Sequence, residues 1–303
     1  MAGGKRLRAA FCRAGWLVAG GDPDDPSIVT AAASLEWLQG SALVHDDLMD
    51  GSDTRRGNPS VHRAFEQRHR DGDADVVGDA ERFGLSTAVL LGDLMLSWAD
   101  EQLRSSGLPR VPEALHYLDL CRSEVVAGQY LDVLAQTRPT VTVEEAMTIV
   151  RFKAASYTVE RPLHIGAALA GADDALVRAL SAVAVPLGQA FQLRDDLLGV
   201  FGDPAVTGKR TGDDLREGKR TVLVARAIEL GTDDDRALLT RLLGTQDGVE
   251  PLTDLLVRTG ALAAVERDIA RLEHEVDAAI GALGDRGRSV LGPLALSATR
   301  RTS

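Results

Sequence analysis

Three carboxylates stand close together in the segment HDDLMD, residues 45–50. If the segment is helical, Asp46 and Asp50 lie on one face of the helix, about 5.4 Å apart along its axis. Like charges at that spacing destabilise a helix unless a positive group lies between them. Hard cations such as Mg²⁺ prefer oxygen ligands and complete their shell with water and substrate phosphates. The spacing therefore indicates a divalent-cation site that works with a phosphorylated ligand.

A second acidic segment repeats this pattern further along the chain. In QLRDDLL, residues 192–198, apolar residues again lead into an Asp pair, Asp195 and Asp196, and a loop with basic residues follows. A single Asp pair is equally well explained by a solvated helix end. Two pairs in matching apolar contexts instead favour two helices that present similar ends to one cavity.

Basic residues cluster in four short segments of this otherwise acidic chain. Glycine lets the backbone approach a phosphate, Arg binds phosphate oxygens in a bidentate fork, and Lys acts as a point charge. Each Lys or Arg alone is better explained as a surface charge. As a set they suit two diphosphates better than one. The segments are GGKRLR (3–8), TRRG (54–57), FK (152–153) and TGKRTGDDLREGKRT (207–221).

Composition narrows the class of protein. The chain has 303 residues and a formal net charge of −11, so it lacks the global basic field that attracts nucleic acids or anionic membranes. Two cysteines make neither a disulfide framework nor a thiolate metal site. No uninterrupted apolar run reaches the ~18 residues of a membrane span, and the start lacks a signal-peptide pattern. We expect a cytoplasmic protein.

The acidic segments fall on predicted helices. Apolar residues recur at spacings of three and four from Ile28 to Leu48, and Ser27 can cap that helix. Sparse strand signals and loops too short to be linkers predict a single all-α domain over residues 1–303, a helical bundle. The other predicted helices are Leu85 to Leu103, Pro112 to Leu134, Val143 to Leu169, Ala175 to Val200, Thr221 to Leu230, Asp233 to Leu243 and Leu252 to Leu283.

The ordered set of motifs resembles the trans-isoprenyl diphosphate synthases, most closely the bacterial geranylgeranyl diphosphate synthases of the polyprenyl synthetase group. The resemblance runs from Gly3 to about Thr221 and implies an all-helical isoprenoid-synthase fold around a deep central cavity, usually as a homodimer. A single DDxxD motif would be weak evidence for this family, but here the types of the motifs, their order and their spacing all agree with it. The motifs are GGKRLR, LQGSALVHDDLMD, DTRRG, LLGDLML, AGQYLDV, FKAASYTVERP, FQLRDDLLGVFGD and GKRTGDDLREGKRT.

The resemblance implies roles for these residues in an Mg²⁺-dependent condensation of isopentenyl diphosphate with an allylic diphosphate (dimethylallyl, geranyl or farnesyl). Three Mg²⁺ ions would hold the allylic diphosphate, with Asp46, Asp50 and Asp195 as direct ligands and Asp47 and Asp196 as supports. The same diphosphate would be held by Arg55, Lys153 and Lys209, with Lys219 closing over it. Isopentenyl diphosphate would be held by Lys5, Arg8, Gln39 and Arg56. Gln192 would steady the allylic cation, together with the carbonyl of Lys153 or the side chain of Tyr157.

Product length follows from the residues that precede the first acidic segment. One turn before Asp46 lie Ser41 and Ala42, which are small, so a fifteen-carbon chain is not stopped there. One further turn away, Trp37 or Leu38 would stop the chain near twenty carbons if either points into the cavity. Trp37 is equally well explained as core packing. Geranylgeranyl diphosphate is therefore the expected product, with farnesyl or longer products as alternatives.

Two features depart from the family pattern. Gly199 stands where the second motif often has a third Asp, which predicts weaker metal affinity without loss of chemistry. The motif GGKR begins at Gly3, so either the start is misassigned or an N-terminal helix is missing, and dimer stability and closure over Lys5 would be affected.

Three other classes of protein remain as alternatives. His45 beside Asp46 suggests a metal phosphohydrolase, but the other histidines do not cluster around it. A class I terpene cyclase would carry a second motif of Asn, Ser and Glu, which is absent, and more aromatic residues to steer cations. A non-catalytic partner subunit would have lost an Asp motif or its basic residues.

Overall fold

The computed structural model describes residues 6–72, 77–202 and 211–299, and its regular structure is almost entirely helical. This confirms the predicted all-α class. The strands β1 (Thr54–Arg55) and β2 (Asn58–Pro59) form a short antiparallel hairpin. The helices are α1 (Leu7–Val18), α2 (Ser27–Met49), α3 (Val61–Arg70), α4 (Ala80–Arg104), α5 (Val111–Gln136), α6 (Val143–Ile149), η1 (Val150–Glu160), α7 (Arg161–Leu169), α8 (Asp174–Phe201), α10 (Asp213–Arg216), α11 (Val222–Leu230), α12 (Asp233–Leu242), η2 (Gln246–Gly248), α13 (Val249–Arg258), α14 (Ala261–Ala282) and α15 (Gly284–Thr299).

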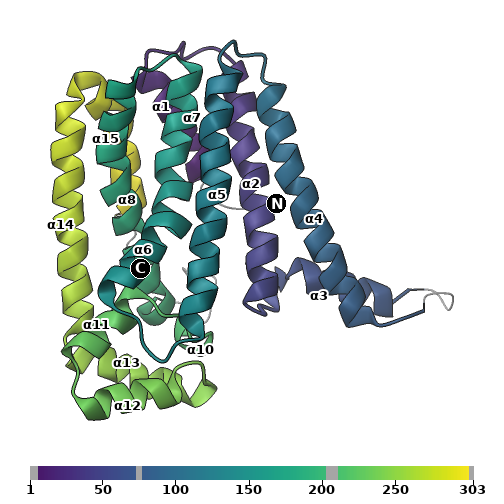
Figure 1. Ribbon diagram of the computed structural model, residues 1–303, viewed down its shortest axis with the longest axis vertical. Coiled ribbons are helices and arrows are strands. Elements are labelled where there is room, and N and C mark those ends of the chain that lie inside the picture. The colour runs from purple at the N-terminus through teal and green to yellow at the C-terminus, as the bar shows by residue number, and fades with distance from the viewer. Residues whose placement is uncertain (1–5, 73–76, 203–210, 300–303) are drawn as a thin grey trace.

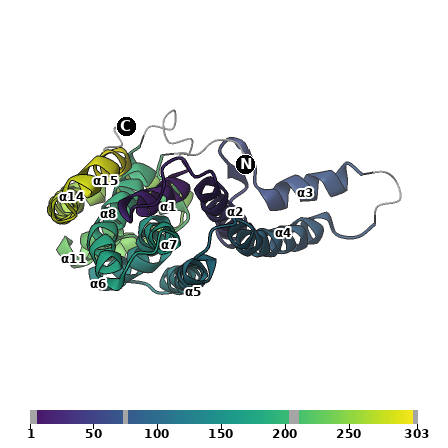
Figure 2. The same cartoon turned by 90° about the horizontal axis from the view of Figure 1, so that it is seen from above.

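The long helices lie side by side, and the short helices α10 to α13 gather at one end of the bundle (Figure 1). The C-terminal end of α2 points to the same end of the molecule, next to the β1–β2 hairpin and α3. Seen along the bundle, α3 and α4 extend away from α8, α14 and α15 (Figure 2). Both acidic segments therefore lie at the end covered by α10.

Side-chain caps fix where several helices begin. Asp173 accepts a hydrogen bond from the backbone of Leu176 at the start of α8, and Thr142 and Glu145 form a capping box on α6. The predicted cap at Ser27 is wrong, because Ser27 is the first residue inside α2. The carboxylate of Asp25 accepts from the Ser27 backbone N–H instead, at 2.8 Å.

Two predicted helices differ from the observed ones. The stretch 143–169 is continuous, but its middle part, η1, is a π-helix, the wider form that often occurs at functional sites. The stretch 252–283 is broken between α13 and α14, where Gly260 adopts a left-handed conformation with φ 79°. Glycine takes that conformation without the steric penalty of a side chain, so it ends α13 and starts α14.

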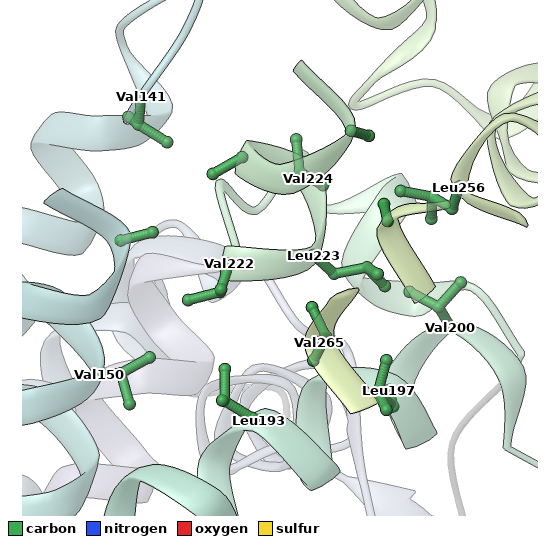
Figure 3. Packing of buried hydrophobic residues seen from close by; sticks show 14 of the residues in the cluster. Val141, Val150, Leu193, Leu197, Val200, Val222, Leu223, Val224, Leu256 and Val265 are labelled. Carbon is green, nitrogen blue, oxygen red and sulfur yellow. The ribbon is translucent and has the colours of Figure 1, made fainter. Parts of the chain in front are cut away.

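Aliphatic side chains fill the core, as the low aromatic content requires. One buried cluster joins the short helices α11 and α13 to the long helices α8 and α14 (Figure 3). Leu193 and Leu197 enter it from α8 and Val265 from α14, so the helix that carries Asp195 is anchored on its apolar face. Two further clusters lie among α1, α2, α4, α5 and α7, and among α1, α7, α8 and α15.

Among the residues that the structure describes, α8 is the one helix long and apolar enough to cross a membrane by length and composition. Half of its most apolar window is buried within the bundle, against η1 and α14. A core helix of a folded domain passes the same test.

Candidate active site

The C-terminal end of α2 carries the first acidic segment. The Asp50 backbone N–H bonds to the Asp46 carbonyl at 2.8 Å, so both carboxylates lie on one face as predicted. The C-terminal end of a helix dipole is negative and disfavours anions. The Asp50 side chain is 4% exposed, which adds a desolvation cost. These carboxylates therefore need cations next to them.

Lys153 supplies one of these cations from the π-helix η1. Its Nζ lies 3.3 Å from Asp46 Oδ1 and 2.5 Å from Asp132 Oδ2 on α5. Burial favours a higher pKa for Asp46, but the charges of Lys153, Lys219 and Arg55 outweigh it and lower that pKa. A Cβ on Gly128 would lie 2.4 Å from the Lys153 backbone N, so this close approach of α5 to η1 depends on glycine.

Lys219 supplies a second cation from the segment that follows α10. Its Nζ lies 3.2 Å from Asp50 Oδ2, 2.7 Å from Glu217 Oε2 and 3.8 Å from Asp214 Oδ1. Burial alone would lower the pKa of Lys219, but the three carboxylates outweigh it and raise that pKa. Lys219 therefore stays charged and links the end of α2 to α10.

Arg55 is placed by the β1–β2 hairpin. Arg56 and Gly57 form its two-residue turn with φ of 52° and 76°, the arrangement that matches strand twist in tight hairpins. The turn brings Arg55 back onto α2, where its Nε donates to Asp47 Oδ1 at 2.8 Å and its Nη2 lies 3.8 Å from Asp46. Asp47 is thus buried and paired with Arg55, and its supporting role stays a prediction.

The second acidic segment lies near the end of α8. Asp195 is half-buried, and Asp196 is buried and accepts a hydrogen bond from Gln192 Nε2 at 2.8 Å. Burial raises the pKa of Asp196 to about 8, and the neighbouring charge of Asp214 adds to this effect. Asp214 is thus close both to Asp196 on α8 and to Lys219, which contacts Asp50 on α2. The ends of α8 and α2 therefore belong to one cluster of charged residues.

The residues predicted to hold the second diphosphate are only partly described. Lys5 lies outside the described residues, as does Lys209 of the allylic set. Arg8 stacks over the Tyr157 ring at 4.0 Å and donates to Thr158 Oγ1 at 3.0 Å. The Tyr157 hydroxyl is buried and has no hydrogen-bond partner among the described residues. Gln39 is half-buried on α2, two turns before Asp46.

The predicted chain-length residues lie further down α2. Ser41 is buried and Ala42 half-buried. Leu38 is packed in the core at 2% exposure, whereas Trp37 meets Trp98 of α4 edge to face, with ring centroids 4.9 Å apart. Both tryptophans line a hollow of about 270 Å³ on the side of α4. The role of these residues in product length stays a prediction.

The donor atoms fit a hard divalent cation, although the described residues contain no ready-made group of three or more metal-binding side chains. Near the end of α2 the acidic donors are carboxylate oxygens. Two of them, Asp46 Oδ1 and Glu217 Oε2, are buried and lie close to a Lys, but neither accepts a well-directed hydrogen bond from the described chain. A cation held here would complete its shell with water and substrate oxygens, as Mg²⁺ usually does.

Three carboxylates that contact the two lysines of this site were not assigned from the sequence. Asp132 contacts Lys153, and Asp214 and Glu217 contact Lys219. Their signal was present in the motifs AGQYLDV and TGDDLREGK, but the spacing within each motif gives no indication of the partner. His45 contacts Val89 and Asp93 of α4, so it offers no support for a His-rich hydrolase centre.

Comparison with known proteins gives a consistent result. The polyprenyl synthetase family model matches residues 1–256. The chain is 38% identical over 212 residues to a geranylfarnesyl diphosphate synthase of Natronomonas pharaonis, a match that covers 69% of this chain and 57% of that protein. It is 34% identical over 298 residues to a geranylgeranyl diphosphate synthase of Mycobacterium tuberculosis, covering 94% and 76%.

A solved structure shows the same fold. The crystal structure of a geranylgeranyl pyrophosphate synthase from Corynebacterium glutamicum, complexed with isoprenyl diphosphate and magnesium, superposes with a TM-score of 0.93. The two chains are 42% identical, and the match covers 99% of this chain and 87% of that one.

Proposed function

The chain belongs to the polyprenyl synthetase family, and we propose that it is a prenyltransferase that condenses isopentenyl diphosphate with an allylic diphosphate, with geranylgeranyl diphosphate as its main product. The relatives include geranylfarnesyl and geranylgeranyl synthases, so the family alone leaves product length open.

One observation carries the proposal: carboxylates and cations from distant parts of the chain meet at the end of α2. Lys153 touches Asp46 and Asp132, and Lys219 touches Asp50 and Glu217. In the absence of substrate these cations neutralise the carboxylates. When a diphosphate binds with divalent cations, the lysines would contact the diphosphate oxygens and the aspartates would contact the metal ions.

The allylic diphosphate is bound at this end of the bundle. Arg55, Lys153 and Lys219 contact its oxygens, with Lys209 as the further basic residue. Mg²⁺, in three ions between Asp46, Asp50 and Asp195, would supply Lewis acidity to the leaving diphosphate. Asp47 orients Arg55, and Asp196 with Gln192 supports the end of α8.

Isopentenyl diphosphate is held beside it by Arg8, Gln39, Arg56 and Lys5. Its double bond attacks the allylic carbon as the diphosphate leaves, and a proton then passes to the released diphosphate. Gln192 steadies the developing positive charge together with the carbonyl of Lys153 or with Tyr157, whose buried hydroxyl has no hydrogen-bond partner within the described part of the chain. The surrounding apolar wall excludes water, which would capture the cation.

Product length is set along α2. Ser41 and Ala42 leave room below the acidic segment, and Trp37 and Leu38 end the passage. Leu38 is packed in the core and Trp37 meets Trp98 at the edge of a hollow, so substitution of each residue tests this assignment.

We also propose that the protein is a cytoplasmic homodimer formed through α4. Large apolar side chains are exposed along this helix, among them Leu90 at 68% and Val89 at 42%. An exposed apolar stripe of this kind marks an interaction surface. A second copy of the same chain would bury it.

The experiment is direct. The purified protein is incubated with isopentenyl diphosphate, Mg²⁺ and each allylic primer in turn, and the dephosphorylated alcohols are identified by chromatography. A twenty-carbon alcohol is expected. Fifteen- or twenty-five-carbon alcohols would correct the product length alone. A cyclic hydrocarbon would support a cyclase, orthophosphate without chain growth a hydrolase, and no turnover a non-catalytic subunit.

A further inference from the structure

The π-helix η1 carries Lys153, and the winding of this helix decides where that side chain points. The backbone N–H of Arg161 donates to the carbonyl of Ser156, five residues earlier, which is the π-helical hydrogen bond. Such bonds place about nine residues in two turns, whereas nine residues of an α-helix make about 2.5 turns. If Val150–Glu160 were wound as an α-helix from the start of α7, Lys153 would be rotated by roughly 0.4 of a turn. It would then point away from the carboxylates that it contacts.

A row of three side chains along η1 fits only the π-helical winding. Arg151 Nη2 lies 2.6 Å from the Oε2 of Glu160, nine residues later, and Arg151 Nη1 donates to the Oγ of Ser156, five residues later. The Ser156 hydroxyl in turn donates to the same Glu160 Oε2 at 3.5 Å. In an α-helix, residues five apart point about 140° away from each other and residues nine apart about 180°. The three side chains therefore contact one another only while the segment is wound as a π-helix.

Burial makes this row of contacts strong. Ser156 and Glu160 are buried, and Arg151 is half-buried. Burial favours a higher pKa for Glu160, but the charges of Arg151 and Arg161 outweigh it and lower that pKa. Without Arg151, the Glu160 carboxylate would keep Arg161, whose Nη2 lies 3.9 Å away. Removing one partner of a buried ion pair is costly, because the remaining charge stays out of water.

The flanking helices leave room for the wider π-helix. A Cβ added to Gly188 of α8 would lie 2.5 Å from Ala155 Cα and 2.7 Å from Ala155 Cβ, which is closer than non-bonded atoms approach one another. On α5, Gly128 meets the backbone of Lys153 in the same way. Both neighbours thus approach η1 with bare backbone, and a side chain at either position would push on the segment.

We propose that Arg151 and Gly188 hold η1 in the π-helical form and thereby position Lys153 for the allylic diphosphate. Neither Arg151 nor Gly188 belongs to the motifs that resemble the family. The inference rests on the proposed function, because Lys153 contacts the diphosphate in that mechanism. Arg151 and Gly188 act through η1 and are positioning residues.

The test compares Arg151→Gln with the matched control Glu124→Gln. Glu124 Oε2 accepts from Arg161 Nε at 2.8 Å and joins α5 to α7, so the control loses a partly buried ion pair that does not depend on the winding of η1. Steady-state prenyl transfer is measured at varied allylic primer. In Arg151→Gln, kcat/KM for the primer should fall by roughly 10- to 100-fold, the effect of displacing a positioned group by about 1 Å. In Glu124→Gln it should fall far less.

Hydrogen exchange of the backbone amides, followed by mass spectrometry, tests the winding without substrate. Peptides that cover Val150–Glu160 should exchange faster in Arg151→Gln than in wild type. In Glu124→Gln, faster exchange should be confined to α5 and α7. Arg151→Lys keeps the charge but not the two-pronged contact, so its exchange should lie between those of wild type and Arg151→Gln.

A pair of glycine variants tests the room that α8 leaves. Gly188→Ala adds a Cβ against Ala155 and should both speed exchange in η1 and lower prenyl transfer. Gly292→Ala adds a Cβ to another helix, where nothing lies within 4 Å, and should behave as wild type does.

A double-mutant cycle with Lys153→Ala separates positioning from general damage. If Arg151 acts through Lys153, Arg151→Gln should lower kcat/KM by less than about threefold further once Lys153 is removed, because coupled residues do not add. Thermal unfolding confirms that each variant is folded.

The inference is overturned if Arg151→Gln leaves the exchange of Val150–Glu160 unchanged, or if it lowers prenyl transfer no more than Glu124→Gln does. An undiminished further loss in the Lys153→Ala background would also overturn it, because Arg151 would then act on the fold in general. If wild type transfers no prenyl group, the proposed function fails, and with it the positioning of an allylic diphosphate. Hydrogen exchange of Arg151→Gln would still decide whether this residue holds the π-helical form.

Discussion

Replacing Asp132 by Asn tests the site through a contact that the motifs did not reveal. Asp132 Oδ2 lies 2.5 Å from Lys153 Nζ, which also lies 3.3 Å from Asp46 Oδ1. Asn keeps the shape and one hydrogen bond but removes the charge. A hydrogen bond to a charged group is worth about 1.5–3 kcal/mol; because Lys153 stays charged, the Asn variant keeps part of this value, and the loss is about 1–2 kcal/mol. That corresponds to roughly a 5- to 30-fold effect.

Steady-state prenyl transfer measures this effect. Since Lys153 contacts the allylic diphosphate in the proposed mechanism, kcat/KM for the allylic primer should fall by that factor, and KM for isopentenyl diphosphate should change little. Asp119→Asn is the matched control, because Asp119 lies on the same helix but pairs with Arg122 at the surface, with its side chain 65% exposed. If Asp132→Asn and the control both stay within about twofold of wild type, the assignment of Lys153 to the substrate is wrong.

Three other predictions concern product length, acid stability and assembly. Trp37→Ala or Leu38→Ala should lengthen the product, which is measured by chromatography of the alcohols, and Leu38→Ala should also lower the free energy of unfolding by about 2–5 kcal/mol. An unchanged product in both variants would show that neither residue limits product length. Burial lowers the pKa of His164 from 6.5 to about 4, so between these two pH values the unfolded chain binds a proton at this residue that the folded chain does not. The free energy of unfolding therefore falls as the pH drops from 6.5 to about 4, by at most about 3 kcal/mol. Urea unfolding of His164→Gln should show a smaller fall over the same pH range, and an equal fall would refute this. Leu90→Asp on α4 should convert the dimer to a monomer in sedimentation velocity, while Val257→Asp, at 53% exposure on α13, should not; a wild-type monomer would contradict the proposed dimer.

The helices were largely predictable because their apolar periodicity is strong. The predicted segment from Ile28 to Leu48 corresponds to α2, Ser27–Met49, and the segment from Ala175 to Val200 to α8, Asp174–Phe201. The break at Gly260 was missed because the apolar pattern continues across it. The π-helix could not be predicted, since nothing in local propensity distinguishes it from an α-helix. Its geometry depends on packing against α5 and α8.

The site was predictable where residue type and spacing are enough, as for Asp46 and Asp50. Contacts that join distant segments were not. The approach of Asp132 to Lys153 depends on the glycine at position 128, and the place of Asp214 depends on Gly199. In both cases the contact forms because a glycine has no side chain at that point. A search of the sequence for charged and reactive residues does not reveal such a contact.

The central claim is that the ends of α2 and α8 hold divalent cations around one diphosphate. The most direct test is anomalous diffraction from crystals soaked with Mn²⁺ and inorganic pyrophosphate. The account predicts Mn²⁺ peaks bonded to Asp46 and Asp50 on one side and to Asp195 on the other, with pyrophosphate between them. Peaks on only one of the two helices, or none beside bound pyrophosphate, would contradict it.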